Sequence, residues 1–314
     1  MRFCLILLLL FYGGGAAALD TAAQPARRAA DVKAVGVYAV LAEVDRIAAR
    51  QTLWPNFDPR RVPVEIYYGR TTFLFNHPNP PAEFISLSSR QGVWAFAGRH
   101  ESVTSNATVK LNGVRTATVM IEPASKLSLK ERAALVIHET FHVHQREHHP
   151  KWSGNELELF NYPFEDAELL ALRRLETESL RRAERAARKT DAACHARLAL
   201  DTRRERFARL TKGAAEYERA LELNEGLARY VEARAADRRV SNLPANEYAA
   251  EELRLRSYAT GHALALLLER FAPAWTTRLE TATDSLSLDE LLAAALPPDA
   301  ATTPARHLRV AGNV

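Results

Sequence analysis

The pattern of apolar and polar positions divides the chain into an N-terminal part with strand signals and a longer, mostly helical remainder. Val32 to Ala49 carries apolar residues at helical spacing and predicts one amphipathic helix. Between Trp54 and Ile121, short runs of β-forming residues such as Val62 to Tyr68 alternate with turn residues. Asn112-Gly113 separates two such runs and predicts a β-hairpin. After Pro123 the pattern becomes helical, so we expect an α+β fold that is predominantly helical, with a small mixed N-terminal sheet.

Residues 164 to 238 are unusually rich in helix-forming and charged residues. Their apolar positions form a stripe at helical spacing, which includes Leu169, Leu172, Leu175 and Leu180. The simplest structure is a long antiparallel helical hairpin over about residues 160–215 that turns near Lys189-Thr190-Asp191. A basic helix can bind membranes or nucleic acid, but a solvated face with internal ion pairs is the commoner case.

The first residues have the order of a secretory signal peptide. Arg2 precedes the apolar run Leu5 to Tyr12, and small residues from Gly13 to Ala18 follow it. The apolar run is shorter than the roughly 20 residues that span a bilayer, which disfavours an N-terminal anchor. We expect residues 1–18 to be removed and the protein to be exported to a bacterial periplasm or beyond, with no stable membrane span.

Composition places the chain among ordinary folded proteins. Of its 314 residues, 47% are hydrophobic and 25% are charged, which disfavours a mainly disordered chain. The 42 basic and 38 acidic residues give no reason to expect a nucleic-acid partner. Of the two cysteines, Cys4 lies in the predicted signal peptide, so Cys194 has no partner for an internal disulfide.

The strongest chemical signal is the segment Ile137-His138-Glu139-Thr140-Phe141-His142. His138 and His142 are four residues apart, so on a helix both side chains project from one face, one turn apart. Two imidazoles at that spacing can bind one Zn²⁺ ion. Glu139 lies beside the first histidine, where its carboxylate can act as general base on a metal-bound water. These residues predict a zinc site with hydrolytic chemistry.

The residues around this motif predict the helix that it needs. Ser128 and Glu131 fit a capping box at the start, and Pro150 follows the expected end. Three more histidines follow the motif, namely His144, His148 and His149. We interpret them as solvated residues near the helix end, with a nonspecific metal-binding tract as the alternative.

Zinc needs a third protein ligand, and a later segment offers a candidate. The run Asn224 to Glu232 resembles the glutamate-bearing helix of the gluzincin metallopeptidases. The resemblance implies that Glu225 is the third ligand and that Gly226 is the small neighbour through which two helices approach closely. Glu222, one helical turn earlier, is the rival ligand. Two residues are candidates for contacts around the ligands, namely Arg229 and Glu232.

The spacing of the motifs departs from that of compact gluzincins. Between His142 and Glu225 lie 82 residues, and the predicted helical hairpin accounts for the excess. An antiparallel excursion returns the chain to its starting point, so the insertion is compatible with a shared metal.

The segment Tyr258 to Leu264 is similar to the Y-x-x-G stretch of the gluzincin aminopeptidases related to leukotriene A4 hydrolase. The resemblance implies that the Tyr258 hydroxyl stabilises the oxyanion opposite the zinc. A phenol suits this role because it donates a hydrogen bond where negative charge develops, without adding a full charge to the resting site. His262, one turn later, is the alternative donor, and a core aromatic residue is the other interpretation of Tyr258.

Two further residues are candidates for substrate binding. The same aminopeptidases carry a G-x-M-E-N strand whose glutamate holds the free amine of the substrate. Val119 to Pro123 lacks the matching Gly and Asn, so Glu122 is either a degenerate counterpart or the end of a strand. In gluzincins generally, an edge strand above the cleft pairs with an extended peptide. Thr116 to Met120, with Thr118 at its centre, is the candidate for such strand addition.

These signals divide the chain into a signal peptide (1–18), an N-terminal α+β part with the edge strand (19–127), a helical zinc-peptidase part (128–300) and a tail (301–314). We expect an exported zinc-dependent metallopeptidase that hydrolyses peptide bonds in peptide or protein substrates, with its sheet packed on the zinc helix. A zinc enzyme that cleaves another amide or ester is one alternative. A non-catalytic envelope protein with a structural metal site and a partner-binding hairpin is another, although a purely structural site has no use for Glu139.

Overall fold

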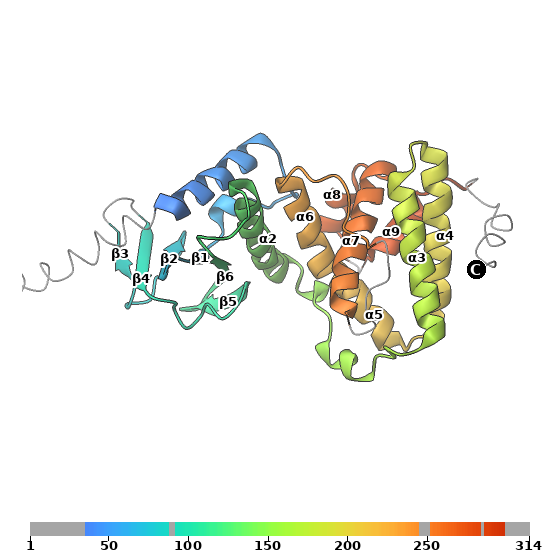
Figure 1. Cartoon of the computed structure of the whole chain (residues 1–314), viewed down its shortest axis with the longest axis horizontal. Helices are drawn as coiled ribbons and strands as arrows, with labels where there is room; N and C mark the ends of the chain where they lie inside the picture. Colours follow the sequence, from blue (N-terminus) through green and yellow to red (C-terminus); the bar gives the residue numbers. More distant parts are fainter. Residues whose placement is uncertain (1–34, 88–91, 245–251, 284–285, 299–314) are drawn as a thin grey trace, which may run out of the picture.

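The computed structural model describes residues 35–87, 92–244, 252–283 and 286–298. The predicted signal peptide and the predicted C-terminal tail lie outside these residues. A sheet lies at one end of the elongated molecule and a helical hairpin at the other, with the remaining helices between them (Figure 1). The expected α+β, predominantly helical fold is therefore confirmed.

Six strands of the described residues form one mixed sheet. They are β1 (Val64–Tyr68), β2 (Thr71–Phe75), β3 (Ile85–Ser86), β4 (Val93–Ala97), β5 (Ala107–Leu111) and β6 (Val114–Ile121). Their spatial order is β3-β4-β2-β1-β6-β5, in which β1 and β6 are parallel and every other pair is antiparallel. The sheet is therefore mixed, as the sequence predicted.

The predicted β-hairpin is confirmed as β5 and β6. Asn112 and Gly113 join the two strands with φ angles of 43° and 84°. Two positive φ angles in a two-residue loop are typical of a type I′ turn, whose twist matches that of the flanking strands. Asn-Gly adopts two positive φ angles at least cost, so this dipeptide between two strand-forming runs predicts the hairpin correctly.

One face of the sheet packs against α2 and against the N-terminal helix, which is described over residues 35–50. This core joins alternate residues of the strands to apolar positions of the two helices, including Ile66, Phe73, Val119, Val40, Val44, Val136 and Ile137. The opposite face carries a smaller apolar cluster around Leu74, Phe84 and Leu111. The sheet thus holds the central part of α2 from one side.

Helices make up most of the remaining described residues. Their bounds are α2 (Leu129–His148), α3 (Ala167–Arg185), α4 (Lys189–Ala208), α5 (Lys212–Leu221), α6 (Leu227–Ala235), α7 (Leu253–Phe271), α8 (Trp275–Glu280) and α9 (Leu288–Ala295). Short 3-10 turns occupy Pro59–Arg61, Pro150–Trp152 and Glu156–Asn161, and a π-helical turn occupies Glu222–Gly226. Among the described residues, no helix combines the length and the apolar character that crossing a membrane requires.

The predicted helical hairpin is confirmed as α3 and α4, and its turn lies directly before the residues near which the sequence placed it. The chain turns at residues 186–188, whereas Lys189-Thr190-Asp191 already forms the first turn of α4. Within this first turn, the Asp191 carboxylate pairs with Arg188 at the N-cap, 2.8 Å from the Arg188 Nε. An acidic residue in the first turn also complements the helix dipole.

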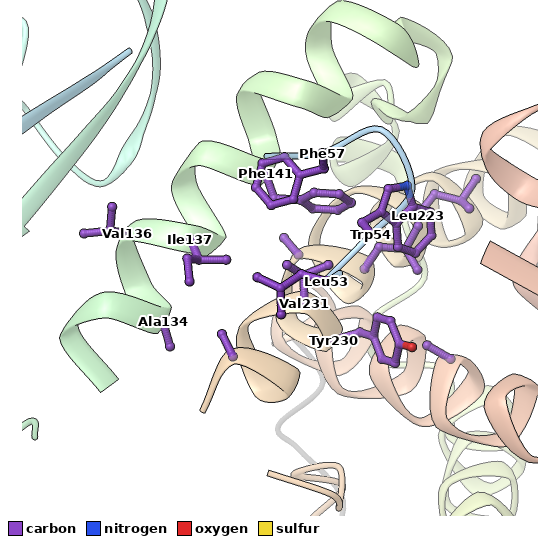
Figure 2. Close-up of a cluster of buried hydrophobic side chains, with 14 of the residues drawn as sticks. Leu53, Trp54, Phe57, Ala134, Val136, Ile137, Phe141, Leu223, Tyr230 and Val231 are labelled. Atoms are coloured by element: carbon purple, nitrogen blue, oxygen red, sulfur yellow. The ribbon is translucent and has the colours of Figure 1, made fainter. Parts of the chain in front are cut away.

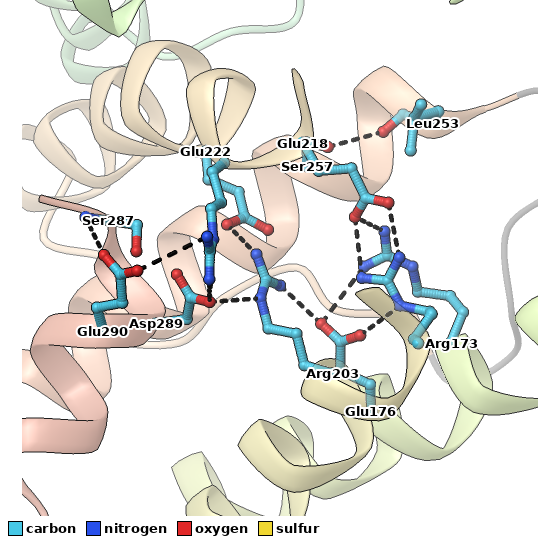
Figure 3. Close-up of polar contacts among 12 residues, drawn as sticks. Arg173, Glu176, Arg203, Glu218, Glu222, Leu253, Ser257, Ser287, Asp289 and Glu290 are labelled. Atoms are coloured by element: carbon cyan, nitrogen blue, oxygen red, sulfur yellow. Dashed lines mark hydrogen bonds and ion pairs between the residues drawn. The ribbon is translucent and has the colours of Figure 1, made fainter. Parts of the chain in front are cut away.

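The prediction of a solvated charged face on this hairpin is wrong for part of it. Arg173, Arg203 and Arg206 are almost fully buried, together with Glu176 and Glu218. Each guanidinium forms an ion pair with at least one of these carboxylates. Figure 3 shows the pairs of Arg173 and Arg203. Burial of so many charges is tolerable only because both signs are present and hydrogen-bonded.

An aromatic cluster connects α2 with the C-terminal helices. The indole of Trp54 makes edge contacts with Phe141 of α2, Tyr230 of α6 and Trp275 of α8, at ring-centroid distances of 5.4, 6.5 and 5.5 Å. Figure 2 shows Trp54 beside Leu223 and Phe57 beside Phe141. The cluster fixes α2 relative to the helix that follows the π turn.

Candidate metal centre

The predicted motif helix is confirmed as α2, and its start is capped as expected. The Ser128 side chain accepts from the Glu131 backbone N–H, and the Glu131 carboxylate accepts from the Ser128 backbone N–H. His138 and His142 lie on one face of α2, and their Nε2 atoms are 3.1 Å apart. The helix therefore brings two imidazole nitrogens to one point, as the spacing predicted.

Glu225 reaches the same point from the π turn. Its Oε2 lies 3.2 Å from His142 Nε2 and 4.0 Å from His138 Nε2. In a tetrahedral zinc site with metal–ligand distances of about 2.0–2.1 Å, ligand atoms lie about 3.3–3.4 Å from one another. The three atoms are thus already close to the positions that one such ion requires, so these residues could hold a metal.

The outward-facing nitrogens of both histidines donate to acceptors. His138 Nδ1 lies 3.1 Å from Glu232 Oε2, and His142 Nδ1 lies 2.8 Å from Gln145 Oε1. The Gln145 amide is itself oriented, because its Nε2 donates to the backbone carbonyls of Leu223 and Asn224. With both protons on Nδ1, both Nε2 lone pairs face Glu225, and three electron-rich atoms converge. This arrangement suits a cation.

Glu232 is held in turn by two arginines. Arg229 Nη1 lies 2.8 Å from Glu232 Oε2, and Arg238 Nη2 lies 2.6 Å from its Oε1. The predicted contacts of Glu232 and Arg229 around the ligands are therefore present. Sequence reasoning missed Arg238 and Gln145, although Gln145 is one turn after His142 and could have been suggested by that spacing.

Glu139 follows His138 on α2 and lies near the point where the His138, His142 and Glu225 side chains meet. Its side chain is buried, and burial raises its pKa, against the opposing effect of His138 and His142. Within the described part of the chain, no residue donates a hydrogen bond to the Glu139 carboxylate or forms an ion pair with it. A carboxylate with a raised pKa is a better proton acceptor than an exposed one.

Glu225 has the opposite electrostatic character. Burial alone would raise its pKa, but the hydrogen bond and positive charge that His142 supplies when protonated, with the charge of His138, lower it to about 2. A positive charge at the two imidazoles therefore keeps Glu225 ionised. An ionised carboxylate is the form that ligates a metal.

Tyr258 of α7 also reaches the centre. Its hydroxyl interacts with Glu225 and Arg254, and burial followed by the Glu225 charge raises its pKa to about 12. The side chain is thus a neutral phenol at the edge of the site rather than an ordinary core aromatic residue. Arg254, which sequence reasoning missed, lies with its Nη2 3.6 Å from Glu225 Oε1. Arg254 faces the oxygen that points away from the histidines.

The rival ligand Glu222 does not join the centre. It is buried and forms an ion pair with Arg203, as Figure 3 shows. The π turn separates the two glutamates, because its wider winding turns Glu225 toward α2 and leaves Glu222 facing α4. The structure therefore brings Glu225, not Glu222, to the two histidines.

The prediction that Thr116 to Met120 is an edge strand is wrong. These residues belong to β6, which lies between β1 and β5 and pairs with both. Thr118 is fully buried, and its hydroxyl donates to the Ser105 carbonyl at 2.8 Å, so it is not available to a substrate. The hairpin that the sequence predicted places β5, and not β6, at the edge.

Glu122 directly follows β6 and is exposed. Within the described residues, no hydrogen bond or ion pair joins Glu122 to His138, His142 or Glu225. Its position agrees with the interpretation as the end of a strand, and a role in holding the substrate amine stays a prediction.

His262 is buried, and within the described residues no hydrogen bond or ion pair joins it to His138, His142 or Glu225. Neither ring nitrogen has a hydrogen-bond partner among the described residues, and burial lowers its pKa to about 4. The ring lies 6.4 Å from that of Tyr230. His262 is therefore a neutral residue of the helix interface, which makes Tyr258 the better placed donor.

The interpretation of the trailing histidines as solvated is right for His148 and wrong for His144 and His149. His148 is exposed, but His144 is 4% exposed and both His144 and His149 approach the Glu280 carboxylate. Glu280 lies more than 130 positions later in the chain, so no local pattern could have indicated this contact.

Comparison with known proteins adds no relative to this picture. No protein-family model, curated protein or solved structure matches the chain.

Proposed function

We propose that this protein is an exported zinc-dependent peptidase in which His138, His142 and Glu225 hold the ion and Glu139 is the general base. The observation that carries the proposal is the combination of three convergent ligand atoms with a neighbouring carboxylate that has no structural partner among the described residues. A structural metal site needs the first feature but not the second. Catalytic hydrolysis needs both.

The chemistry divides between the ion and the side chains around it. Zinc, when bound, polarises a carbonyl and lowers the pKa of a coordinated water. Glu139 accepts the proton of the attacking water and passes it to the leaving amine, for which its raised pKa is suitable. Glu232 and Gln145 keep the histidine protons on Nδ1, so that both Nε2 atoms stay available as ligands.

Tyr258 supplies the hydrogen bond for the developing oxyanion. Its pKa of about 12 keeps the phenol protonated, so it can donate without introducing a charge into the resting site. Its hydroxyl lies near enough to Glu225 for the two groups to interact, which places it at the centre where the oxyanion would form.

The test is a measurement of zinc content together with cleavage of a peptide library. Purified protein should contain one zinc at this centre and should cut peptides, and libraries with free and blocked N-termini report whether a terminal amine is needed. Absence of zinc from Zn²⁺-reconstituted wild-type protein would refute the proposal. Zinc binding without cleavage of any peptide would favour a different hydrolytic substrate or a structural site.

A further inference from the structure

A second group of two histidines and one glutamate lies on another face of α2. His144 follows the ligand His142 by two residues, so its side chain leaves the helix about 200° further around the axis. It meets His149, which caps the end of α2, and Glu280, the last residue of α8. This group is therefore separate from the centre formed by His138, His142 and Glu225.

The three side chains point their ligand-type atoms at one another. His144 Nε2 lies 3.3 Å from Glu280 Oε1, and His149 Nε2 lies 2.9 Å from Glu280 Oε2. All three ligand atoms lie within 4.8 Å of one another. The side chains of His144 and Glu280 are each 4% exposed and that of His149 is 10% exposed, so the group is largely shielded from water.

Aromatic neighbours fix the orientation of both rings. The His144 ring stacks on Phe141 at an interplanar angle of 17°, and the His149 ring stacks on Trp152 at 8° with centroids 3.9 Å apart. These contacts hold both imidazoles with Nε2 directed at Glu280. A site whose ligands are already oriented loses little conformational entropy when it binds an ion.

The carboxylate between the rings has an oxygen with acceptor capacity to spare. Trp54 Nε1 donates to Glu280 Oε2 at 2.7 Å, which is the kind of outer hydrogen bond that ligating carboxylates commonly receive. The nearest donors to Oε1 are weaker, because His144 Nε2 is 3.3 Å away and Asn56 Nδ2 is 3.5 Å away. A cation between Oε1 and the two imidazoles would complete this coordination.

We propose that His144, His149 and Glu280 form a second metal site, suited to a borderline dication such as Zn²⁺ that prefers imidazole nitrogen and carboxylate oxygen. The ion would tie the C-terminal end of α2 to the end of α8. Its role would be to hold α2, the helix of His138 and His142, against the C-terminal helices, next to Trp54, which donates to Glu280. The proposal is independent of any peptidase activity.

The stoichiometry of zinc tests this site with Zn²⁺ alone as the probe. The full-length protein is stripped with a chelator, titrated with Zn²⁺ and dialysed, and zinc is counted by elemental analysis. Wild-type protein should retain two equivalents, whereas Glu280→Gln and His149→Ala should each retain one. The Gln variant preserves the size of the side chain and an acceptor for Trp54, and a circular dichroism spectrum verifies that each variant is folded.

A variant of the first centre separates this proposal from the proposed function. His142→Ala should also retain one equivalent, and the double variant His142→Ala with Glu280→Gln should retain none. If the wild type holds one zinc that Glu280→Gln abolishes and His142→Ala does not, the second site exists and the catalytic zinc is refuted. If it holds one zinc that His142→Ala abolishes and Glu280→Gln does not, the second site is overturned and the group is a hydrogen-bonded cluster only.

Discussion

Gly226 and Gly261 lie face to face where the helix that carries Glu225 crosses the helix that carries Tyr258. A Cβ atom on Gly226 would lie 2.6 Å from the Gly261 Cα, and one on Gly261 would lie 2.8 Å from the Gly226 Cα. Real side chains essentially never come so close to backbone. The crossing therefore needs both glycines, and it brings Glu225 and the phenol of Tyr258 to the same centre.

Replacement of Gly226 by Ala should separate these two helices. We expect Gly226→Ala to lower the free energy of unfolding by about 1–3 kcal/mol, because the added methyl group meets backbone that cannot move aside. It should also weaken zinc binding, since Glu225 is the adjacent residue. Thermal unfolding and zinc titration would measure the two effects.

Gly213 offers the matched control for this substitution. It lies in the first turn of α5, the helix that precedes the π turn. An added Cβ there would meet only the end of the Glu158 side chain. Because that side chain can move and Ala is the better helix former, Gly213→Ala should leave stability unchanged or raise it by up to about 1 kcal/mol. Equal destabilisation by both substitutions would contradict the role assigned to the crossing.

The two glutamates of the π turn should respond differently to the same substitution. Glu225→Gln should weaken zinc binding by more than about 100-fold, because it removes a charged ligand rather than an outer partner. Glu222→Gln should leave zinc affinity unchanged, because Glu222 pairs with Arg203 and not with the two histidines. Zinc titration of both variants, with unfolding curves, would decide the assignment, and the reverse pattern would make Glu222 the ligand.

Glu232 should affect the metal without touching it. Its carboxylate orients His138 through Nδ1, so Glu232→Gln should weaken zinc binding by about 10–100-fold. Glu269 of α7 is a matched control, because its carboxylate accepts a hydrogen bond from Tyr230, which lies on the same helix as Glu232. Among the described residues, Glu269 has no contact with His138, His142 or Glu225. Glu269→Gln should leave zinc affinity unchanged. An unchanged affinity in Glu232→Gln would show that the His138 contact is dispensable.

Glu184 should make stability depend on pH. Burial raises its pKa from 4.5 to about 7, with Ser241 donating to Oε2 and Oε1 lacking a partner among the described residues. A raised pKa in the folded protein stabilises the fold below pH 4.5, and this contribution is lost as the pH rises through 7. Glu184→Gln removes the titration and should raise the free energy of unfolding by up to about 3 kcal/mol at pH 8 but not at pH 4.

Urea unfolding at these two pH values would measure the effect. Glu147→Gln at an exposed position of α2 provides the control, because it makes the same chemical change outside the core. The interpretation fails if Glu184→Gln gives the same difference at pH 4 as at pH 8.

Local patterns predicted the parts of the fold whose cause is local. The capping box of Ser128 and Glu131, the Asn112-Gly113 turn and the four-residue spacing of His138 and His142 each depend on a few neighbouring residues. The crossing at Gly226 was also anticipated, but from a resemblance to gluzincins rather than from periodicity. What the sequence predicted correctly about the site is therefore its motif residues and the close approach of two helices.

The errors concern contacts between distant parts of the chain. Whether β6 lies at an edge depends on its pairing with β1, some fifty residues earlier, which no local signal reports. Likewise, His144 is buried because Glu280 packs against it, and Arg203 is buried because carboxylates from two other helices meet it. The choice between Glu222 and Glu225 required the π turn, whose wider winding is not apparent from residue periodicity.

The most direct test of the central claim compares wild-type protein with Glu139→Gln, for zinc content and for the rate of peptide cleavage in the same preparation. If Glu139 is the general base, the variant retains zinc at the wild-type stoichiometry while cleavage falls by about 10²–10⁴-fold. A variant that holds zinc and cleaves peptides at the wild-type rate would contradict the account.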